Sequence, residues 1–182
     1  DDVLLHALPI YHVHGLFVGL HCVLMSGASM HWLSGFTVRQ VRDLLPQSTV
    51  MMGVPTYYTR LLADDAFGRD ECRSMRLFVS GSAPLLEETF DSFAARTGHT
   101  ILERYGMSET GMNCSNPLNG ERRAGTVGFP LPGTEIRICD GEHNPLPPGA
   151  IGELEVRGPN VFKGYWRMPE KTAADFSEDG WF

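Results

Sequence analysis

The segment Glu103–Asn113 has the sequence ERYGMSETGMN and directly follows Thr100–Leu102, a short apolar run with the character of a β-strand. Its polar side chains should emerge at the carboxyl end of that strand, where open α/β sheets bind their ligands. A ring can stack on a base, a hydroxyl can donate to a phosphate oxygen, and a carboxylate is the usual protein ligand of a phosphate-bound Mg²⁺. The segment supplies these groups in Tyr105, Ser108, Thr110 and Glu109. It favours a nucleotide site, with an ordinary turn carrying a solvated Glu as the alternative.

On the N-terminal side of this segment, apolar runs alternate with helical patterns. The runs predict strands over 3–8, 29–33, 49–54, 75–79 and 100–102, and the patterns between them predict helices over 16–25, 37–45, 56–63 and 85–96. Thr37 is placed to cap the second helix, and Gly98 to end the fourth. This alternation predicts an α/β fold in which a parallel sheet is flanked by helices on both faces.

After residue 116 the pattern changes to closely spaced turns between alternating runs. The runs cover 134–138 and 152–157, and the turns lie at Asn119-Gly120, Pro132-Gly133 and Pro148-Gly149. We therefore expect two subdomains. Residues 1–115 would form an α/β subdomain that binds acyl groups and nucleotides, and residues 116–182 a small, truncated, antiparallel β-barrel-like subdomain.

The charge pattern excludes some classes of partner. The chain has a formal net charge of -7, and its 13 Arg and 2 Lys are scattered along the sequence. This argues against a nucleic-acid or anionic membrane surface. The longest apolar stretch, 14–28, is interrupted by His21 and Ser26 and is too short to span a bilayer. We therefore expect no nucleic-acid partner and no membrane span.

The cysteines and histidines give little evidence of disulfides or of zinc. Four widely separated cysteines without a CxxC pair indicate free or buried thiols in a reducing compartment, which fits the cytoplasm, or the mitochondrial matrix of a eukaryote. Three histidines, His6, His12 and His14, raise the question of a metal site. Because they have no nearby Cys or acidic partner, we expect unrelated side chains rather than zinc ligands.

Six stretches together resemble one family, the adenylate-forming acyl-CoA synthetases. They are PIYHVHGL (9–16), VPTYYTRLL (54–62), SGSAPL (80–85), ERYGMSET (103–110), GTVGFPLPG (125–133) and GELEVRGPNVFKGYW (152–166). They occur in the family's order and spacing and cover essentially the whole chain. The resemblance implies ATP, Mg²⁺ and CoA as cofactor and co-substrates, and an internal fragment of the family's large N-terminal domain.

The resemblance also implies roles for individual residues. Tyr105 would stack on adenine, Ser108, where Thr is commoner, would contact the α-phosphate, and Glu109 would hold Mg²⁺. His12 would lie near the phosphates, so that the catalytic set is His12, Ser108 and Glu109; a loop histidine bonded to backbone is the alternative for His12. The remaining nucleotide-binding residues would be Ser82, Ala83, Pro84, Glu103, Gly106 and Met107.

Two arginines bear on the acid that is activated. Arg104 precedes Tyr105, where many fatty-acyl and aryl members have a small residue, and Arg60 lies on the helix after VPT. Guanidinium groups directed into an apolar site need an anion; the alternative is that they pair with a local carboxylate such as Glu103 or lie on the surface. The similarity to the malonyl-CoA and methylmalonyl-CoA synthetases in this family implies that Arg60, Ser82 and Arg104 bind the carboxylate that does not react.

The expected reaction is the ATP- and CoA-dependent conversion of a small dicarboxylate, malonate or also methylmalonate, to its CoA thioester through an acyl adenylate. The family's phosphate loop, ribose-binding Asp and adenylation Lys are not found in this sequence, so we expect the chain alone to be inactive. A fatty-acyl or aryl ligase of the same family and a non-catalytic nucleotide- or acyl-binding module remain the alternatives.

Overall fold

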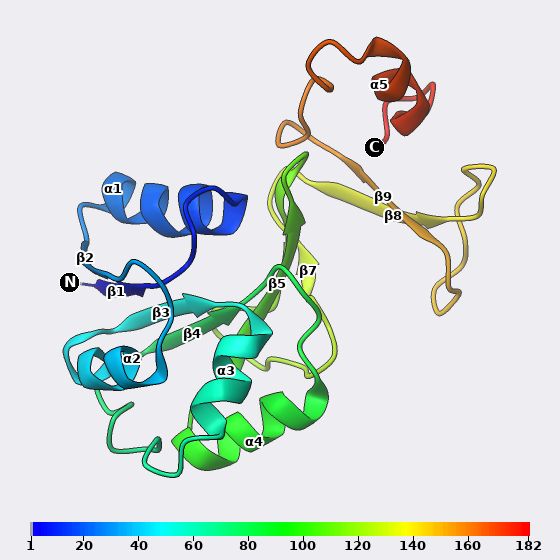
Figure 1. Ribbon diagram of the computed structural model, residues 1–182. Coiled ribbons are helices and arrows are strands. Elements are labelled where there is room, and N and C mark those ends of the chain that lie inside the picture. The colour runs from blue at the N-terminus through cyan, green and yellow to red at the C-terminus, as the bar shows by residue number, and fades with distance from the viewer. Residues whose placement is uncertain (1) are drawn as a thin grey trace.

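The computed structural model describes residues 2–182, and its centre is a seven-stranded sheet (Figure 1). The strand order is β2-β1-β3-β4-β5-β6-β7. The pairs from β2 to β5 are parallel, whereas β6 and β7 add on antiparallel. The strands are β1 (Val3–His6), β2 (Ser29–Trp32), β3 (Val50–Gly53), β4 (Leu77–Ser80), β5 (Ile101–Met107), β6 (Gly111–Ser115) and β7 (Phe129–Pro130).

Helices cover both faces of the parallel part, which confirms the predicted α/β class (Figure 1). One face carries α2 (Val38–Leu44) with the short 3-10 helix η2 (Leu45–Gln47), α3 (Pro55–Leu62) and α4 (Glu87–Thr97). The other carries a π-helix, η1 (His14–His21), continued by α1 (Cys22–Ser26). Thr37 Oγ1 accepts from the Gln40 amide, and Gly98 ends α4 at a φ of 81°, as expected.

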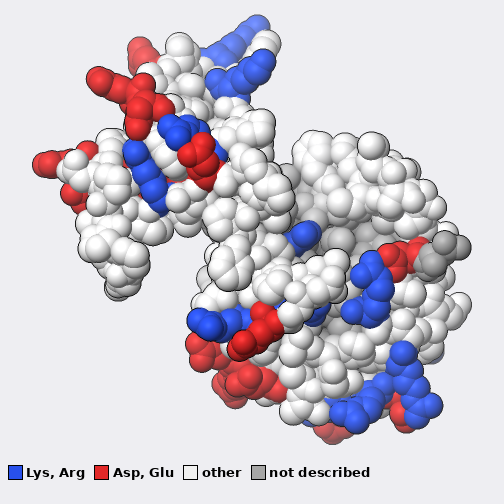
Figure 2. Space-filling view, turned by 180° about the vertical axis from the view of Figure 1, so that it is seen from behind, with Lys and Arg blue, Asp and Glu red and all other residues white. Residues whose placement is uncertain are grey.

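The alternation of side chains along each strand divides the core into two layers. Leu5, Met51 and Phe78 are fully buried on the face under α2, α3 and α4. Their neighbours Leu4 and Val50 point to the opposite face, toward α1. This second layer is thinly covered, and the surface over η1 and α1 is largely without charge (Figure 2). Because both faces are apolar, the strands read as continuous apolar runs in the sequence.

The last parallel strand extends further than the sequence suggested. The prediction that it ends at Leu102 is wrong: β5 continues to Met107 and turns back into β6 as a hairpin. The register shifts between Tyr105 and Gly106, and a Cβ on Gly106 would lie 2.0 Å from the Gly111 carbonyl oxygen. Only glycine allows this close approach of the two backbones. The polar residues after Leu102 remain in a strand because they pair with β6.

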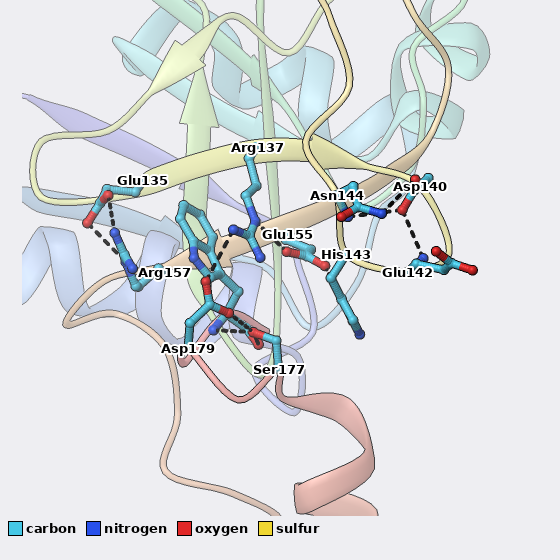
Figure 3. A network of polar contacts seen from close by, with 11 residues as sticks. Glu135, Arg137, Asp140, Glu142, His143, Asn144, Glu155, Arg157, Ser177 and Asp179 are labelled. Atoms are coloured by element: carbon cyan, nitrogen blue, oxygen red, sulfur yellow. Dashed lines mark hydrogen bonds and ion pairs between the residues drawn. The ribbon is translucent and has the colours of Figure 1, made fainter.

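The predicted runs 134–138 and 152–157 form a separate antiparallel pair, β8 (Glu135–Cys139) and β9 (Glu153–Arg157). The guanidinium carbons of Arg137 and Arg157 each lie 4.4 Å from the ring centre of Trp181. Both arginines belong to a network of polar contacts with neighbouring carboxylates (Figure 3). Glu155 accepts from Arg137 at 2.6 Å and also pairs with His143. The small antiparallel part of the fold is thus held together by charged side chains on one face of a two-stranded sheet.

Two further elements, a helix near the C-terminus and a short strand before β8, lie outside the β8–β9 pair. After β9 lies α5 (Pro169–Asp175). The strand β7 pairs with β6 in the large sheet, although it follows residue 116, where the β-rich subdomain is expected to begin. No helix in the described range, 2–182, has the length and apolar character needed to cross a bilayer.

Candidate functional site

Two cavities meet at the carboxyl ends of β4 and β5. Cavity A, of about 440 Å³, is lined among others by His12, His14, Ser82, Gly106, Met107, Ser108 and Glu109. Cavity B, of about 370 Å³, is lined among others by Ser82, Ala83, Pro84, Glu103, Arg104, Tyr105 and Gly106. Ser82 and Gly106 belong to both linings, so the two spaces adjoin. Every predicted site residue except Arg60 and Thr110 lines one of them, while their roles stay predictions.

The hairpin turn between β5 and β6 presents Ser108 and Glu109 to cavity A. The Glu109 carbonyl accepts from the Phe162 amide at 2.7 Å, and its carboxylate accepts from the Tyr165 hydroxyl at 3.2 Å. Asn160 donates to the Thr110 carbonyl at 2.8 Å. The segment after β9 therefore fixes the turn through three contacts. Sequence reasoning missed Tyr165, because nothing local connects it with Glu109.

The turn after β4 shapes the wall shared by the two cavities. Ser82 has a φ of 69°, a left-handed conformation that residues other than glycine rarely adopt. Its hydroxyl lies 3.1 Å from Nδ1 of His14. Glu103, only 5% exposed, accepts from the Leu85 amide at 2.9 Å through Oε1. Its second oxygen has no hydrogen-bond partner among residues 2–182, and burial raises the pKa of Glu103.

Arg104 is half-buried in the wall of cavity B, and burial lowers the pKa of its guanidinium. Its Nε donates to the Ser115 hydroxyl at 3.1 Å. Across residues 2–182, no carboxylate lies within ion-pair distance of Arg104. The alternative in which Arg104 pairs with Glu103 is therefore wrong. A partly desolvated cation with a neutral partner is suited to an anionic ligand.

Arg60 is not brought together with Ser82 and Arg104. It is exposed on α3, and its guanidinium lies 4.8 Å from the ring centre of Phe36. It lines neither cavity A nor cavity B, although Val54, the residue before α3, lines cavity A. Over the same described range it has no ion pair. The expectation of a surface arginine describes this position better than a preformed clamp.

The two loop histidines of the PIYHVHGL stretch have different environments. His12 is exposed at the edge of cavity A, with its ring 4.7 Å from that of Tyr11. His14 is 2% exposed, and burial, with Arg104 and His6 nearby, lowers its pKa to about 4. The sequence singled out His12 and missed His14, since a spacing of two residues does not reveal which ring is buried.

The residues present fit a nucleotide with a bound cation. Tyr105 and Glu103 line cavity B, while Ser108 and Glu109 line cavity A. Residues 2–182 contain no group of three or more His, Cys, Asp or Glu side chains that could hold a metal. A Mg²⁺ on Glu109 would therefore take its other ligands from phosphate oxygens and water, which is its usual manner of binding.

Known proteins resemble the chain over its whole length. The mitochondrial malonate–CoA ligase ACSF3 of Mus musculus is 42% identical over 218 residues, covering 100% of this chain and 37% of that protein. ATP-bound MatB from Rhodopseudomonas palustris aligns with a TM-score of 0.98 and 55% identity, covering 100% and 36%. A malonyl-CoA ligase in a ternary product complex with methylmalonyl-CoA and AMP aligns with a TM-score of 0.90 and 43% identity, covering 100% and 40%.

The chain thus spans just over a third of the length of these relatives. Its mixed sheet, flanking helices and small antiparallel pair match the corresponding part of the adenylate-forming fold. A family model described as AMP-binding enzyme matches residues 1–166. Since this match takes in most of the sequence, the chain belongs to the AMP-binding enzyme family.

Proposed function

We propose that the full-length protein containing this chain is an acid–thiol ligase that converts malonate, and also methylmalonate, to its CoA thioester at the expense of ATP. The observation that carries the proposal is Arg104, a half-buried cation beside Ser82 with no carboxylate partner in residues 2–182. A malonate bound there would place its second carboxylate on Arg104 and Ser82. The malonate–CoA ligase of Mus musculus, 42% identical to this chain, supports the choice of acid.

The reaction has two displacement steps. One oxygen of the reacting carboxylate attacks the α-phosphorus of ATP, the bond to the β-phosphate breaks, and pyrophosphate leaves. The CoA thiolate then attacks the acyl carbonyl, and AMP leaves. Both steps bring anions together, so the protein's task is positioning and charge neutralisation. No side chain has to become a covalent nucleophile.

Cavity A would hold the phosphates. The Ser108 hydroxyl can donate to an α-phosphate oxygen, and His12 stands at the same edge. Glu109 would hold the Mg²⁺, which neutralises phosphate charge when bound. Tyr165 donates to one oxygen of Glu109, and no hydrogen bond within residues 2–182 engages the other, so one oxygen is left for the cation.

Cavity B would hold the adenine. Tyr105 supplies a ring face, and the unpartnered oxygen of Glu103 can accept from the exocyclic amino group. A base with a carbonyl at that position would place its own acceptor oxygen against the acceptor oxygen of Glu103. The geometry therefore favours ATP over inosine or guanosine triphosphate.

The specificity for a dicarboxylate is assigned first to Arg104 and Ser82. Each charge-assisted hydrogen bond contributes about 1.5–3 kcal/mol, and a monocarboxylate would leave the half-buried guanidinium without this partner. Arg60 would join them only if its side chain turned away from Phe36. We therefore expect Arg60 to contribute less than Arg104.

The test measures pyrophosphate release by the full-length protein with malonate, methylmalonate and butyrate. Arg104→Met should lower kcat/KM for malonate by at least about 10²-fold, as expected for a loss near 3 kcal/mol, while the penalty against butyrate shrinks. Methylmalonate should remain a substrate, since one methyl group changes binding by only about 1–3 kcal/mol. Arg39→Met is the matched control, because the Arg39 side chain is 93% exposed on α2.

Three outcomes would contradict the proposal. An equal loss of malonate and butyrate activity in Arg104→Met would assign Arg104 to the fold or to the ATP site. A wild-type enzyme that prefers a long-chain or aromatic acid would establish the other ligase type. Absence of pyrophosphate release with every acid, together with retained ATP binding, would indicate a binding module.

A further inference from the structure

His14 lines cavity A, and the proposed reaction does not use it. Its hydrogen bond connects two segments of the site, the start of η1 and the turn after β4. His14 is 2% exposed and lies at the start of η1, while Ser82 lies in the turn after β4. Nδ1 of His14 and the Ser82 hydroxyl oxygen are 3.1 Å apart, across 68 positions of sequence. The ring also packs against Gly81, where a Cβ would lie 3.3 Å from its Cε1. The turn is therefore shaped around this imidazole.

The protonation of the ring decides what the hydroxyl can do. Burial, with Arg104 and His6 nearby, lowers the pKa of His14 to about 4, so the ring is neutral near pH 7 and carries one N–H. If the proton is on Nδ1, it is donated to Ser82, and the hydroxyl proton is free for a ligand. If it is on Nε2, the serine proton is used on His14.

The surroundings of Nε2 favour the first tautomer. Nε2 is buried and has no hydrogen-bond partner among residues 2–182. A proton there would be a buried donor without an acceptor, and such orphaned N–H groups are rarer in proteins than unsatisfied acceptors. With the proton on Nδ1, the ring nitrogen that lacks a partner is only a lone pair.

We propose that His14 is a positioning residue for substrate specificity, whose Nδ1–H donates to Ser82 Oγ and thereby leaves the Ser82 hydroxyl proton to the non-reacting carboxylate of the acid. This rests on the proposed function. The unusual backbone of Ser82, at a φ of 69°, brings its side chain to the wall common to both cavities. His14 then fixes which way the hydroxyl of that side chain donates. Ser82 and Arg104 together give the carboxylate one neutral and one cationic donor.

The test is a double-mutant cycle in the full-length protein, with KM for malonate and for butyrate as readouts. The variants are Ser82→Ala, His14→Leu, the double variant, and His14→Asn, whose amide nitrogen can replace the Nδ1–H donor. His14→Leu should raise KM for malonate about 10-fold, as expected for losing one oriented bond to a charged group, with little change for butyrate. His14→Asn should restore most of the loss. In the Ser82→Ala background, His14→Leu should have no further effect.

The contrary outcomes are distinct. An equal cost of His14→Leu in the wild-type and Ser82→Ala backgrounds would mean that His14 acts by packing alone and would overturn the inference. If His14→Leu does not fold, His14→Asn and His14→Gln decide, because only the shorter amide can reach the Nδ1 position; equal KM values for malonate would overturn it. A wild-type enzyme without malonate preference overturns the proposed function as well, whereas a malonate-specific enzyme without coupling overturns only the role of His14.

Discussion

At the residue scale, the site is defined by two polar groups, the buried carboxylate of Glu103 and the half-buried guanidinium of Arg104. One oxygen of Glu103 has no donor, and the Arg104 guanidinium has no anion, within residues 2–182. Groups of this kind cost stability unless a ligand supplies the missing partner. They lie side by side in the sequence but face different ligand groups in our proposal, a base and a carboxylate. Their arrangement is better explained by binding than by stability.

Glu103→Gln tests the proposed contact with the base. The amide keeps an oxygen for the Leu85 amide but replaces the free acceptor by a donor, so KM for ATP should rise about 10-fold. Inosine triphosphate, which carries a carbonyl in place of the amino group, should become relatively better. The measurement is pyrophosphate exchange of the full-length protein with each nucleotide. Glu88→Gln, on the exposed face of α4, is the control, and an unchanged ratio of the two nucleotides would exclude the contact.

The lowered pKa of His14 predicts how the free energy of unfolding changes with pH. Its folded-state pKa of about 4 lies below the ordinary histidine value of 6.5, so between these values the unfolded chain binds a proton that the folded chain does not. The free energy of unfolding should therefore fall as the pH drops from 6.5 to 4, by up to about 3 kcal/mol from this group. Burial also lowers the pKa of His6, so His6 contributes to the fall in the free energy of unfolding with the same sign.

The measurement is the urea midpoint of the full-length protein at several pH values between 7 and 4. His14→Asn removes the titrating group, so its midpoint should decline less steeply than that of the wild type over this range. Parallel curves for the two proteins would show that His14 titrates normally. The comparison isolates His14, because Arg104, His6 and the carboxylates are the same in both proteins.

At the scale of elements, the hairpin of β5 and β6 supplies residues to both cavities of the site. The bulge at Tyr105 and Gly106 lets the middle of the strand, from Glu103 to Gly106, line cavity B, and its end, Gly106 and Met107, line cavity A. The segment after β9 then holds the turn through Phe162 and Tyr165. The position of Glu109 consequently depends on contacts from a part of the chain more than fifty residues away.

Gly106→Ala should disrupt this hairpin. Its Cβ would meet the Gly111 carbonyl oxygen at 2.0 Å, and backbone cannot move aside as a flexible side chain can. We expect a loss of at least about 2 kcal/mol in the free energy of unfolding, in the upper part of the range for overpacking. Gly35→Ala is the matched control, since a Cβ there has nothing within 4 Å and should change stability by less than about 0.5 kcal/mol. Urea midpoints that match for the two variants would show that the hairpin can open to accept a side chain.

At the scale of the whole molecule, two bodies meet at the site: the seven-stranded sheet with its helices, and the β8–β9 pair with α5 (Figure 1). Charged side chains gather on the rim of the first and over the second (Figure 2). The net charge of the chain is -7, but Arg104 places a positive charge in the wall of cavity B. In our proposal, an anionic substrate is therefore held by this local cation rather than attracted by the overall charge.

The sequence by itself determined the α/β class, the parallel strands, the caps at Thr37 and Gly98 and the antiparallel runs near the C-terminus. It also named many of the residues that line the two cavities, although not His14. These follow from local periodicity, turn residues and contiguous motifs, which are present before the chain folds. Only the tertiary structure decided that His14 rather than His12 is buried against Ser82, that Tyr165 holds Glu109, and that Arg60 lies on Phe36 away from Arg104. The physical reason is that these contacts join residues 68 or 56 positions apart. Such contacts, and the burial of a side chain, depend on how whole elements pack, which short-range sequence patterns do not specify.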